Sequence, residues 1–156
     1  MKSLIASFII ILLLAACSTD DEQNNSNVRL ELEGNDYNTV LLQKNEENQS
    51  SSDMTEQFND EGTIDNIISI INEENIKLNS IDEIDSIEDK MELETYYSFG
   101  FSENDAANSS SIFTFTIFED GTVISSSPNT DDSHYSFISE DLQTNLLDRL
   151  ENIINK

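Results

Sequence analysis

Aromatic and β-branched residues gather in the C-terminal half of the chain and predict a run of strands there. The segments are residues 94–101, 111–118, 122–126 and 134–138. Asp120 and Gly121 form a two-residue turn signal between the second and third segments, which predicts a hairpin. Because side chains alternate along a strand, we expect Phe113, Phe115 and Ile117 on one face of the sheet.

A second alternating pattern begins at Val28. Val28, Leu30 and Leu32 alternate with charged residues, as in a half-buried strand. Gly, Asn and Asp at positions 34–36 are typical of a turn, and a second apolar run follows at residues 37–43. The two runs predict an N-terminal hairpin.

Apolar residues at helical spacing predict two longer helices. In the first, Asp60 or Asn59 is a suitable N-cap for an isoleucine-rich segment, and the acidic cap favours helix over strand. Its apolar residues are Ile64, Ile67, Ile68, Ile70 and Ile71. In the second, Ser139 is the expected N-cap, with Glu140 and Asp141 in the first turn. Its apolar stripe, which must pack on the sheet, is Leu142, Leu146, Leu147, Leu150, Ile153 and Ile154.

Two polar segments carry weaker patterns. Residues 44–57 are Ser-rich and predict a loop, with a short extended piece at 54–58 as the alternative. Residues 76–93 predict one or two short helical turns. The apolar positions that recur there at helical spacing are Ile81, Ile84, Ile87 and Met91.

The order of these elements predicts one α+β domain over residues 28–156. Strands that follow one another through short turns favour antiparallel pairing. We therefore expect an antiparallel sheet with two helices packed on one face.

The first 16 residues have the layout of an export signal. Lys2 supplies a positive charge, residues 4–14 are apolar apart from one serine, and small residues follow. The sequence LAAC at residues 14–17 resembles the lipobox of bacterial lipoproteins. This resemblance implies a diacylglyceryl group on the Cys17 thiol and peptidase cleavage between Ala16 and Cys17. An ordinary secretory signal or an uncleaved anchor is the alternative.

A lipid anchor at Cys17 would place the chain on the extracytoplasmic face of the cell membrane. Residues 17–27 are polar beyond the cysteine and predict a disordered, acidic tether. Two or more acyl chains hold a protein stably on a bilayer. The chain has one Cys, so no disulfide can form within it, and the anchor gives that cysteine a covalent use.

The charge of the chain excludes some partners. The 156 residues include 32 Asp and Glu against 7 Lys and Arg, for a formal net charge of -25. Such a surface is repelled by nucleic acid and by anionic phospholipid. We expect no nucleic-acid partner, and we expect membrane contact through the lipid anchor.

Several motifs after the tether resemble the YhfM-like domain of small Gram-positive lipoproteins. They are DEGTIDNIISIIN at residues 60–72, YYSFGF at 96–101, FTFTIFEDGTVI at 113–124 and HYSFIS at 134–139, followed by an amphipathic helix. The likeness covers about residues 55–156 and fits least over residues 79–92. That family is functionally uncharacterised and supplies no catalytic residue, so the resemblance implies a location and a fold.

The residue types needed for most catalytic sites are scarce. His134 is the only imidazole, and Cys17 is assigned to the anchor, so Ser-His-Asp, Cys-His and multi-histidine metal sites cannot be assembled. Four glycines leave little room for a phosphate-binding loop. Acids are so abundant that no carboxylate pair stands out as catalytic. We expect no enzymatic activity and no cofactor.

Calcium is the one cation that the acidic segments suit. The candidate ligands are Asp82, Glu83, Asp85, Glu88 and Asp89, with Asp131 and Asp132 as a separate pair. Neither group has the turn glycine and closing Glu of an EF-hand. Weak calcium binding is therefore the expectation, with Asp82, Asp85 and Asp89 as its candidate residues.

Two functions remain in play. The first is a non-enzymatic binding or interaction module that meets an envelope protein through its exposed edge strands and the Ser-rich turns at residues 109–111 and 125–127. The alternative is an accessory protein that binds a cation or a small ligand through its acidic surface. A two-lobed solute receptor is excluded because residues 28–156 are too few for two lobes.

Overall fold

The computed structural model of the chain describes residues 28–32, 37–47, 49–81, 84–103, 113–126 and 135–154. The predicted signal peptide and the predicted tether lie outside these residues, and so does Cys17. None of the helices in the described part of the chain is long and apolar enough to cross a membrane.

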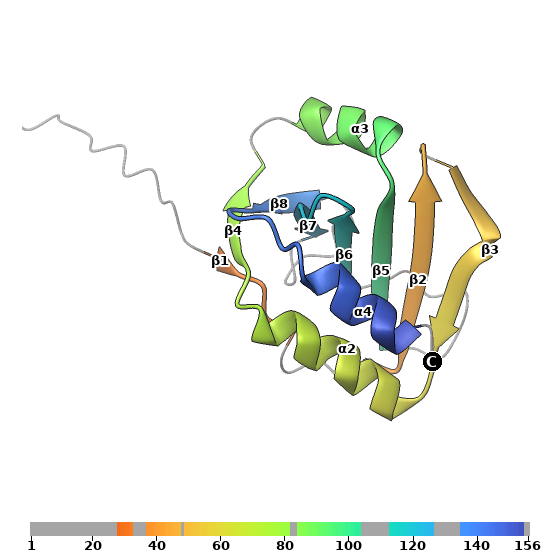
Figure 1. Cartoon of the computed structure of the whole chain (residues 1–156). Coiled ribbons are helices and arrows are strands. Elements are labelled where there is room, and N and C mark those ends of the chain that lie inside the picture. Colours follow the sequence, from red (N-terminus) through yellow and green to blue (C-terminus); the bar gives the residue numbers. More distant parts are fainter. Residues whose placement is uncertain are drawn as a thin grey trace, which may run out of the picture.

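One eight-stranded sheet runs through the domain, and the strand pairs in it are antiparallel. The strands are β1 (Val28–Arg29), β2 (Thr39–Glu46), β3 (Gln49–Phe58), β4 (Lys77–Ser80), β5 (Tyr96–Ser102), β6 (Phe113–Phe118), β7 (Val123–Ser126) and β8 (Tyr135–Ser139). Their order across the sheet is β1-β4-β8-β7-β6-β5-β2-β3 (Figure 1). The described edge strands are therefore β1 and β3, and β2, β5 and β6 lie side by side.

Three helices accompany the sheet in the described residues: α2 (Glu61–Glu73), α3 (Ile84–Leu93) and α4 (Leu146–Ile154). Asp60 is the N-cap of α2, as predicted, and its Oδ1 accepts a hydrogen bond of 2.8 Å from the amide of Thr63. This bond lowers the pKa of Asp60 because it favours the charged carboxylate. The prediction of a mixed α and β domain with a large antiparallel sheet is confirmed.

The larger core cluster joins α2 and α4 to the sheet. Phe99 and Phe115 lie opposite each other on β5 and β6 with ring centroids 5.7 Å apart, and Phe101 and Phe113 repeat the pairing at 5.8 Å. Buried residues from the helices in the same cluster are Ile64, Ile67, Ile71, Leu146 and Leu150. Phe113, Phe115 and Ile117 all lie in this cluster, so the prediction that they share one face of the sheet is confirmed.

A smaller cluster lies on the other face of the sheet. Tyr96, Phe118 and Ile124 are strand residues that alternate with those of the larger cluster, and they pack with Ile87 of α3. Lys90 ties α3 to the β6–β7 turn, because its Nζ lies 2.7 Å from Asp120 and 2.8 Å from Glu94. The helical turns expected within residues 76–93 are therefore present as α3, and residues 77–80 of that segment form β4 instead.

The predicted hairpin of residues 28–43 is wrong. β1 pairs with β4, whereas β2 pairs with β3 and β5 at the far side of the sheet. Leu30 and Leu32 are buried in the larger cluster, where the amide of Leu30 donates to the carbonyl of Ile76. The burial of these two leucines among residues distant in the sequence removes their apolar surface from water. This burial outweighs the local turn signal.

The loop predicted for residues 44–57 is also wrong. β2 continues to Glu46, and β3 begins at Gln49 after a turn in which Glu47 has a φ of 48°. The pairing of the two strands shifts in register between Gln43 and Asn45. The alternative, an extended piece at residues 54–58, is confirmed. The observed strand is longer than this piece, since it also covers the Ser-rich residues before it.

The last helix begins later than predicted. Ser139 ends β8 instead of capping a helix, and its Oγ accepts from the amide of Val123 at 3.0 Å. Leu142 is 60% exposed, so it is not part of the buried stripe. The connection is fastened to the β6–β7 turn by the amide of Gln143, which donates to the carbonyl of Gly121 at 2.7 Å. Residues 144–145 form a turn after this contact, and α4 begins at Leu146.

Candidate functional site

Most of the residues that the sequence singled out lie outside the described part of the chain. These are Cys17, Asp82, Glu83, Asp131, Asp132 and His134. Asp85, Glu88 and Asp89 lie on α3 and are exposed. The described residues contain no group of three or more His, Cys, Asp or Glu side chains that could hold a metal ion.

The predicted contact surface included a Ser-rich turn at residues 125–127. This prediction is wrong for Ser125 and Ser126. Ser125 and Ser126 belong to β7 and are buried. The Oγ of Ser126 accepts a hydrogen bond of 2.9 Å from the amide of Thr114, which joins β7 to β6 beyond their paired residues. Ser127 and the turn at residues 109–111 lie outside the described residues.

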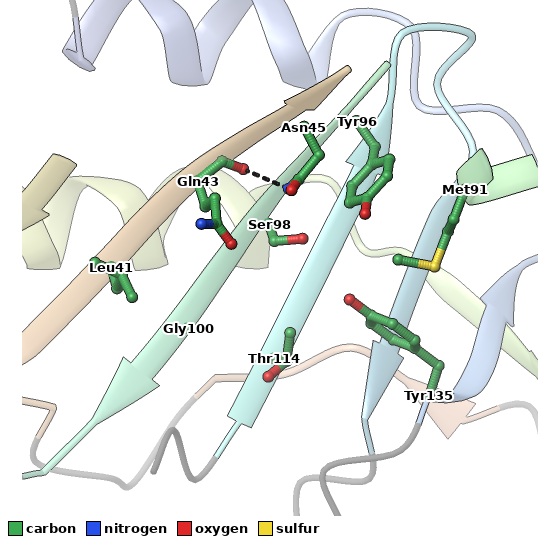
Figure 2. Close-up of a pocket in the computed structure, with 9 residues that line it drawn as sticks. All are labelled: Leu41, Gln43, Asn45, Met91, Tyr96, Ser98, Gly100, Thr114 and Tyr135. Carbon is green, nitrogen blue, oxygen red and sulfur yellow. Dashed lines mark hydrogen bonds between the residues drawn. The ribbon is translucent and has the colours of Figure 1, made fainter. Parts of the chain in front are cut away.

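The best-built candidate is a hollow on the sheet face opposite the larger core cluster, here named the sheet-face hollow. It has a volume of about 290 Å³. Its lining is Leu41, Gln43, Asn45, Met91, Tyr96, Ser98, Gly100, Thr114 and Tyr135 (Figure 2). These residues come from four strands and α3, and the topology alone brings them together.

The strand register explains the floor of the hollow. Leu41 lies opposite Gly100, and Gly100 lies opposite Thr114, so the three form one row across β2, β5 and β6. Gln43 and Ser98 begin the next row. Because Gly100 has no side chain, the middle of the first row is bare, and this leaves room above the central strand.

A chain of three hydroxyl groups lies at one side of the hollow. Ser98 Oγ is 2.8 Å from Thr116 Oγ1, which in turn is 2.8 Å from the hydroxyl of Tyr135. Thr116 is fully buried beneath the hollow. Three hydroxyls carry three protons and the two bonds use two of them, so one proton remains for a further acceptor. Each hydroxyl can also accept, so the chain can reverse its direction.

Amide side chains of β2 line the hollow beside Ser98 and Tyr96. Asn45 is 7% exposed, and its Nδ2 donates to the main-chain carbonyl of Gln43 at 3.3 Å. Figure 2 shows the Gln43 and Ser98 side chains close together above the strands. Each amide offers both a donor and an acceptor, so this side of the hollow resembles the hydroxyl chain in its hydrogen-bonding capacity.

Aromatic and sulfur-containing side chains form the third side. The hydroxyls of Tyr96 and Tyr135 are directed toward the hollow, and Met91 of α3 lies between the two rings (Figure 2). Burial raises the pKa of Tyr96, and the neighbouring Tyr135 adds to the effect. The hydroxyl of Tyr96 therefore stays protonated at neutral pH and acts as a neutral group.

The described residues of the lining carry no formal charge. None of the nine described lining residues is Asp, Glu, Lys or Arg, although the chain has 39 such residues. Lys90, on the helix that supplies Met91, is instead paired with Asp120 and Glu94. The described lining of the hollow is thus neutral and polar, although the protein as a whole is strongly acidic.

A second hollow of about 410 Å³ lies on the other face, beside Ile154 of α4. Lys44 and Glu56 are among its lining residues, so it is charged. Lys44 already contacts Glu46 at 2.7 Å and lies 5.7 Å from the ring centroid of Tyr97. Its cation is therefore engaged, and the sheet-face hollow is the stronger candidate.

The sequence carried one signal for the sheet-face hollow. In YYSFGFS the large aromatic residues alternate with Ser98, Gly100 and Ser102. Small residues on one face of a central strand indicate space above it. The partners from β2 and β8 could not be found this way, because only the topology makes them neighbours.

No family model matches the chain, and neither a curated protein nor a solved structure matches it.

Proposed function

We propose that this chain is a lipid-anchored, extracytoplasmic binding module without catalytic activity, held at the membrane through Cys17. The support for the anchor is the order of positive residue, apolar segment and LAAC box at the N-terminus. The motifs that resemble YhfM-like lipoproteins support the same location in a Gram-positive envelope. The binding partner in this proposal is a component of that envelope.

The observation that carries the binding role is the sheet-face hollow. Its polar groups include a spare hydroxyl proton and two side-chain amides, gathered in one recess. Recesses lined by apolar and aromatic residues with a few convergent polar groups are typical of ligand sites. A volume of about 290 Å³ is at the small end of their range.

The layer arrangement in this proposal has α2 and α4 packed on one face of the sheet, with the hollow on the other. It is supported by the shared core of both helices with Phe99 and Phe115, which alternate with the hollow residues Ser98 and Thr114. Arg149 of α4 also pairs with Glu73 and Glu74 at the end of α2. A face supported from behind in this way is rigid, which favours recognition.

The lining also supports a role without catalysis. Acid-base chemistry needs a group that gains or loses a proton near neutral pH. Among the described lining residues the titratable groups are tyrosines, and the pKa of Tyr96 is raised further from neutrality. Hydrogen bonding, and not proton transfer, is the chemistry that these side chains offer.

A photo-crosslinking residue at position 41 tests the binding role on intact source cells. Leu41 is 40% exposed at the rim of the hollow. Leu142 is the matched control, because it is also an exposed leucine and lies in the connection before α4. We expect one enriched adduct from position 41 and none from position 142. Equal labelling from both positions would contradict the proposal.

The anchor is tested separately with Cys17→Ser. We expect the wild type in the membrane fraction and labelled by radioactive palmitate. The variant should lose the label and stay uncleaved, because the lipid-dependent peptidase no longer acts. Unlabelled wild-type protein released into the medium would favour an ordinary secretory signal.

A further inference from the structure

We propose that the sheet-face hollow binds a neutral sugar unit of a glycan. This inference rests on the proposed function, since it names the ligand of the same site.

The net charge of the chain and the absence of charged groups among the described lining residues favour a neutral ligand. The net charge of -25 disfavours anions at any surface of the chain. Carboxylates are the usual ligands of hard cations in proteins, and the described lining residues include none. These two observations favour a ligand of the hollow that is polar and uncharged.

The hydrogen-bonding groups match hydroxyls. The chain of Ser98, Thr116 and Tyr135 can donate at either end and can accept at the other, because its direction is not fixed. A sugar hydroxyl likewise donates and accepts. Beside Ser98, the side-chain amide of Gln43 pairs one donor with one acceptor, which suits two adjacent hydroxyls.

The apolar side suits the carbon face of a sugar ring. Tyr135 and Met91 are half-buried and present ring and thioether surface, whereas Tyr96 is 4% exposed and contributes little surface. Tyrosine is common in such sites because an apolar body and a polar tip act together. The bare strand at Gly100 leaves space for a ring to lie over β5.

The position of the hollow argues against an extended peptide as its ligand. Peptides that add to a sheet need an edge with unpaired main-chain groups. The central strands of the hollow, β5 and β6, are each paired on both sides, as is β2. Recognition here must therefore use side chains, and this favours a compact ligand.

Saturation-transfer NMR on the lipidated full chain in detergent micelles tests the inference. The neutral probes are cellobiose and N,N′-diacetylchitobiose, and the charged probes are glucuronate and glucosamine. We expect transfer to at least one neutral probe, strongest at one ring, and little transfer to either charged probe. Binding in the range of about 1 mM is sufficient for detection.

Three variants locate the site. Tyr135→Phe removes the hydroxyl at the end of the chain and should weaken binding about tenfold. Gly100→Val fills the floor and should abolish binding; Gly100 does not have a positive φ, so a strand residue fits there. Tyr97→Phe removes the hydroxyl of the adjacent residue on the other face and should leave binding unchanged. Thermal melts establish that each variant is folded.

The outcomes separate this inference from the proposed function. No transfer to the neutral probes, or equal transfer with Gly100→Val, overturns the sugar assignment. A protein adduct from position 41 together with that result would leave the binding module standing with a different ligand. Failure of both experiments would remove both proposals.

Discussion

The two faces of the sheet are made from alternate residues of the same strands, yet they differ in kind. On β5 and β6, Phe99 and Phe115 are fully buried in the larger cluster, which also contains residues of α2 and α4. One residue away, Ser98 and Thr114 line the sheet-face hollow. One face is closed by aromatic packing, and the other keeps polar groups in a recess.

This contrast separates stability from recognition within single strands. The aromatic face buries the apolar surface that drives folding. The other face has its own smaller cluster around Phe118 and Ile124, and this cluster shares Tyr96, Met91 and Tyr135 with the hollow. The hollow residues outside both clusters, such as Ser98 and Thr114, can therefore change with little loss of stability, and residues of the larger cluster cannot.

Replacing a core aromatic residue should have the largest effect. Phe115→Ala leaves a cavity at a fully buried position and should cost about 3–5 kcal/mol. Thr114→Val, the neighbouring residue on the hollow face, should change stability by about 0.5 kcal/mol or less. Urea unfolding followed by circular dichroism measures both. Similar losses for the two variants would break the distinction between the faces.

Thr116→Val tests the buried middle of the hydroxyl chain. The variant leaves Ser98 and Tyr135 without their shared partner, so we expect a loss of about 1 kcal/mol. Binding at the hollow should weaken as well, because the two outer hydroxyls lose their fixed orientation. Calorimetric melting gives the stability, and Tyr135→Phe serves as the control that keeps one of the two bonds. Unchanged binding in Thr116→Val would show that the chain is not used for recognition.

The ion pair of Lys90 and Asp120 should give a pH-dependent effect. Burial alone would raise the pKa of Asp120, but hydrogen bonds from Lys90 and Thr122 outweigh it and lower the pKa. A lowered carboxyl pKa stabilises the fold above its unfolded value, near 3.9, and this contribution is lost as pH falls through the folded value. Since the Asp120 side chain is 43% exposed, we expect only about 0.5–1 kcal/mol at pH 7.

The measurement for this pair is the stability of Asp120→Asn against the wild type across pH. Asparagine keeps an acceptor for the amide of Thr122, so the change isolates the charge. The difference should be present at pH 7 and should vanish in acid below the folded pKa. A difference that persists there would point to packing of α3 instead of the ion pair.

Calcium should have the smallest effect. Asp85 and Asp89 lie one turn apart on α3, on the same element as Met91 of the hollow, and Asp82 lies outside the described residues. We expect calcium to raise the melting temperature no more than sodium chloride of equal ionic strength, because screening alone relieves the net charge. A calcium-specific rise that is lost in the triple variant Asp82→Asn, Asp85→Asn, Asp89→Asn would support the cation-binding alternative.

Local signals in the sequence predicted the elements that form locally. The turn at Asp120 and Gly121 joins β6 to β7, and the cap at Asp60 begins α2. Each depends on neighbouring residues and elementary backbone geometry. The partner of β1 could not be predicted in this way, because Leu78 of β4 is distant in the sequence.

The Ser-rich strand β3 shows the same limit. Residues 49–57 lack the alternation of a half-buried strand, and pairing with β2 makes them extended. The hollow is a further case, since Gln43, Ser98 and Tyr135 become neighbours only after the strands are ordered. Polar residues gave no local sign of this convergence, because the same residues are common in loops.

Under the proposed attachment through Cys17, any pull would reach the folded domain at its N-terminal strand. β1 is an edge strand with two residue pairs to β4, and beyond it the amides of Leu30 and Leu32 donate to Ile76 and Asn72. A pull on the N-terminus therefore peels these few bonds one after another. Three strands, β4, β8 and β7, separate this edge from β6. The domain would thus yield first at β1 and residues 30–32, and the load would then pass to β2, the strand that follows β1 in the chain.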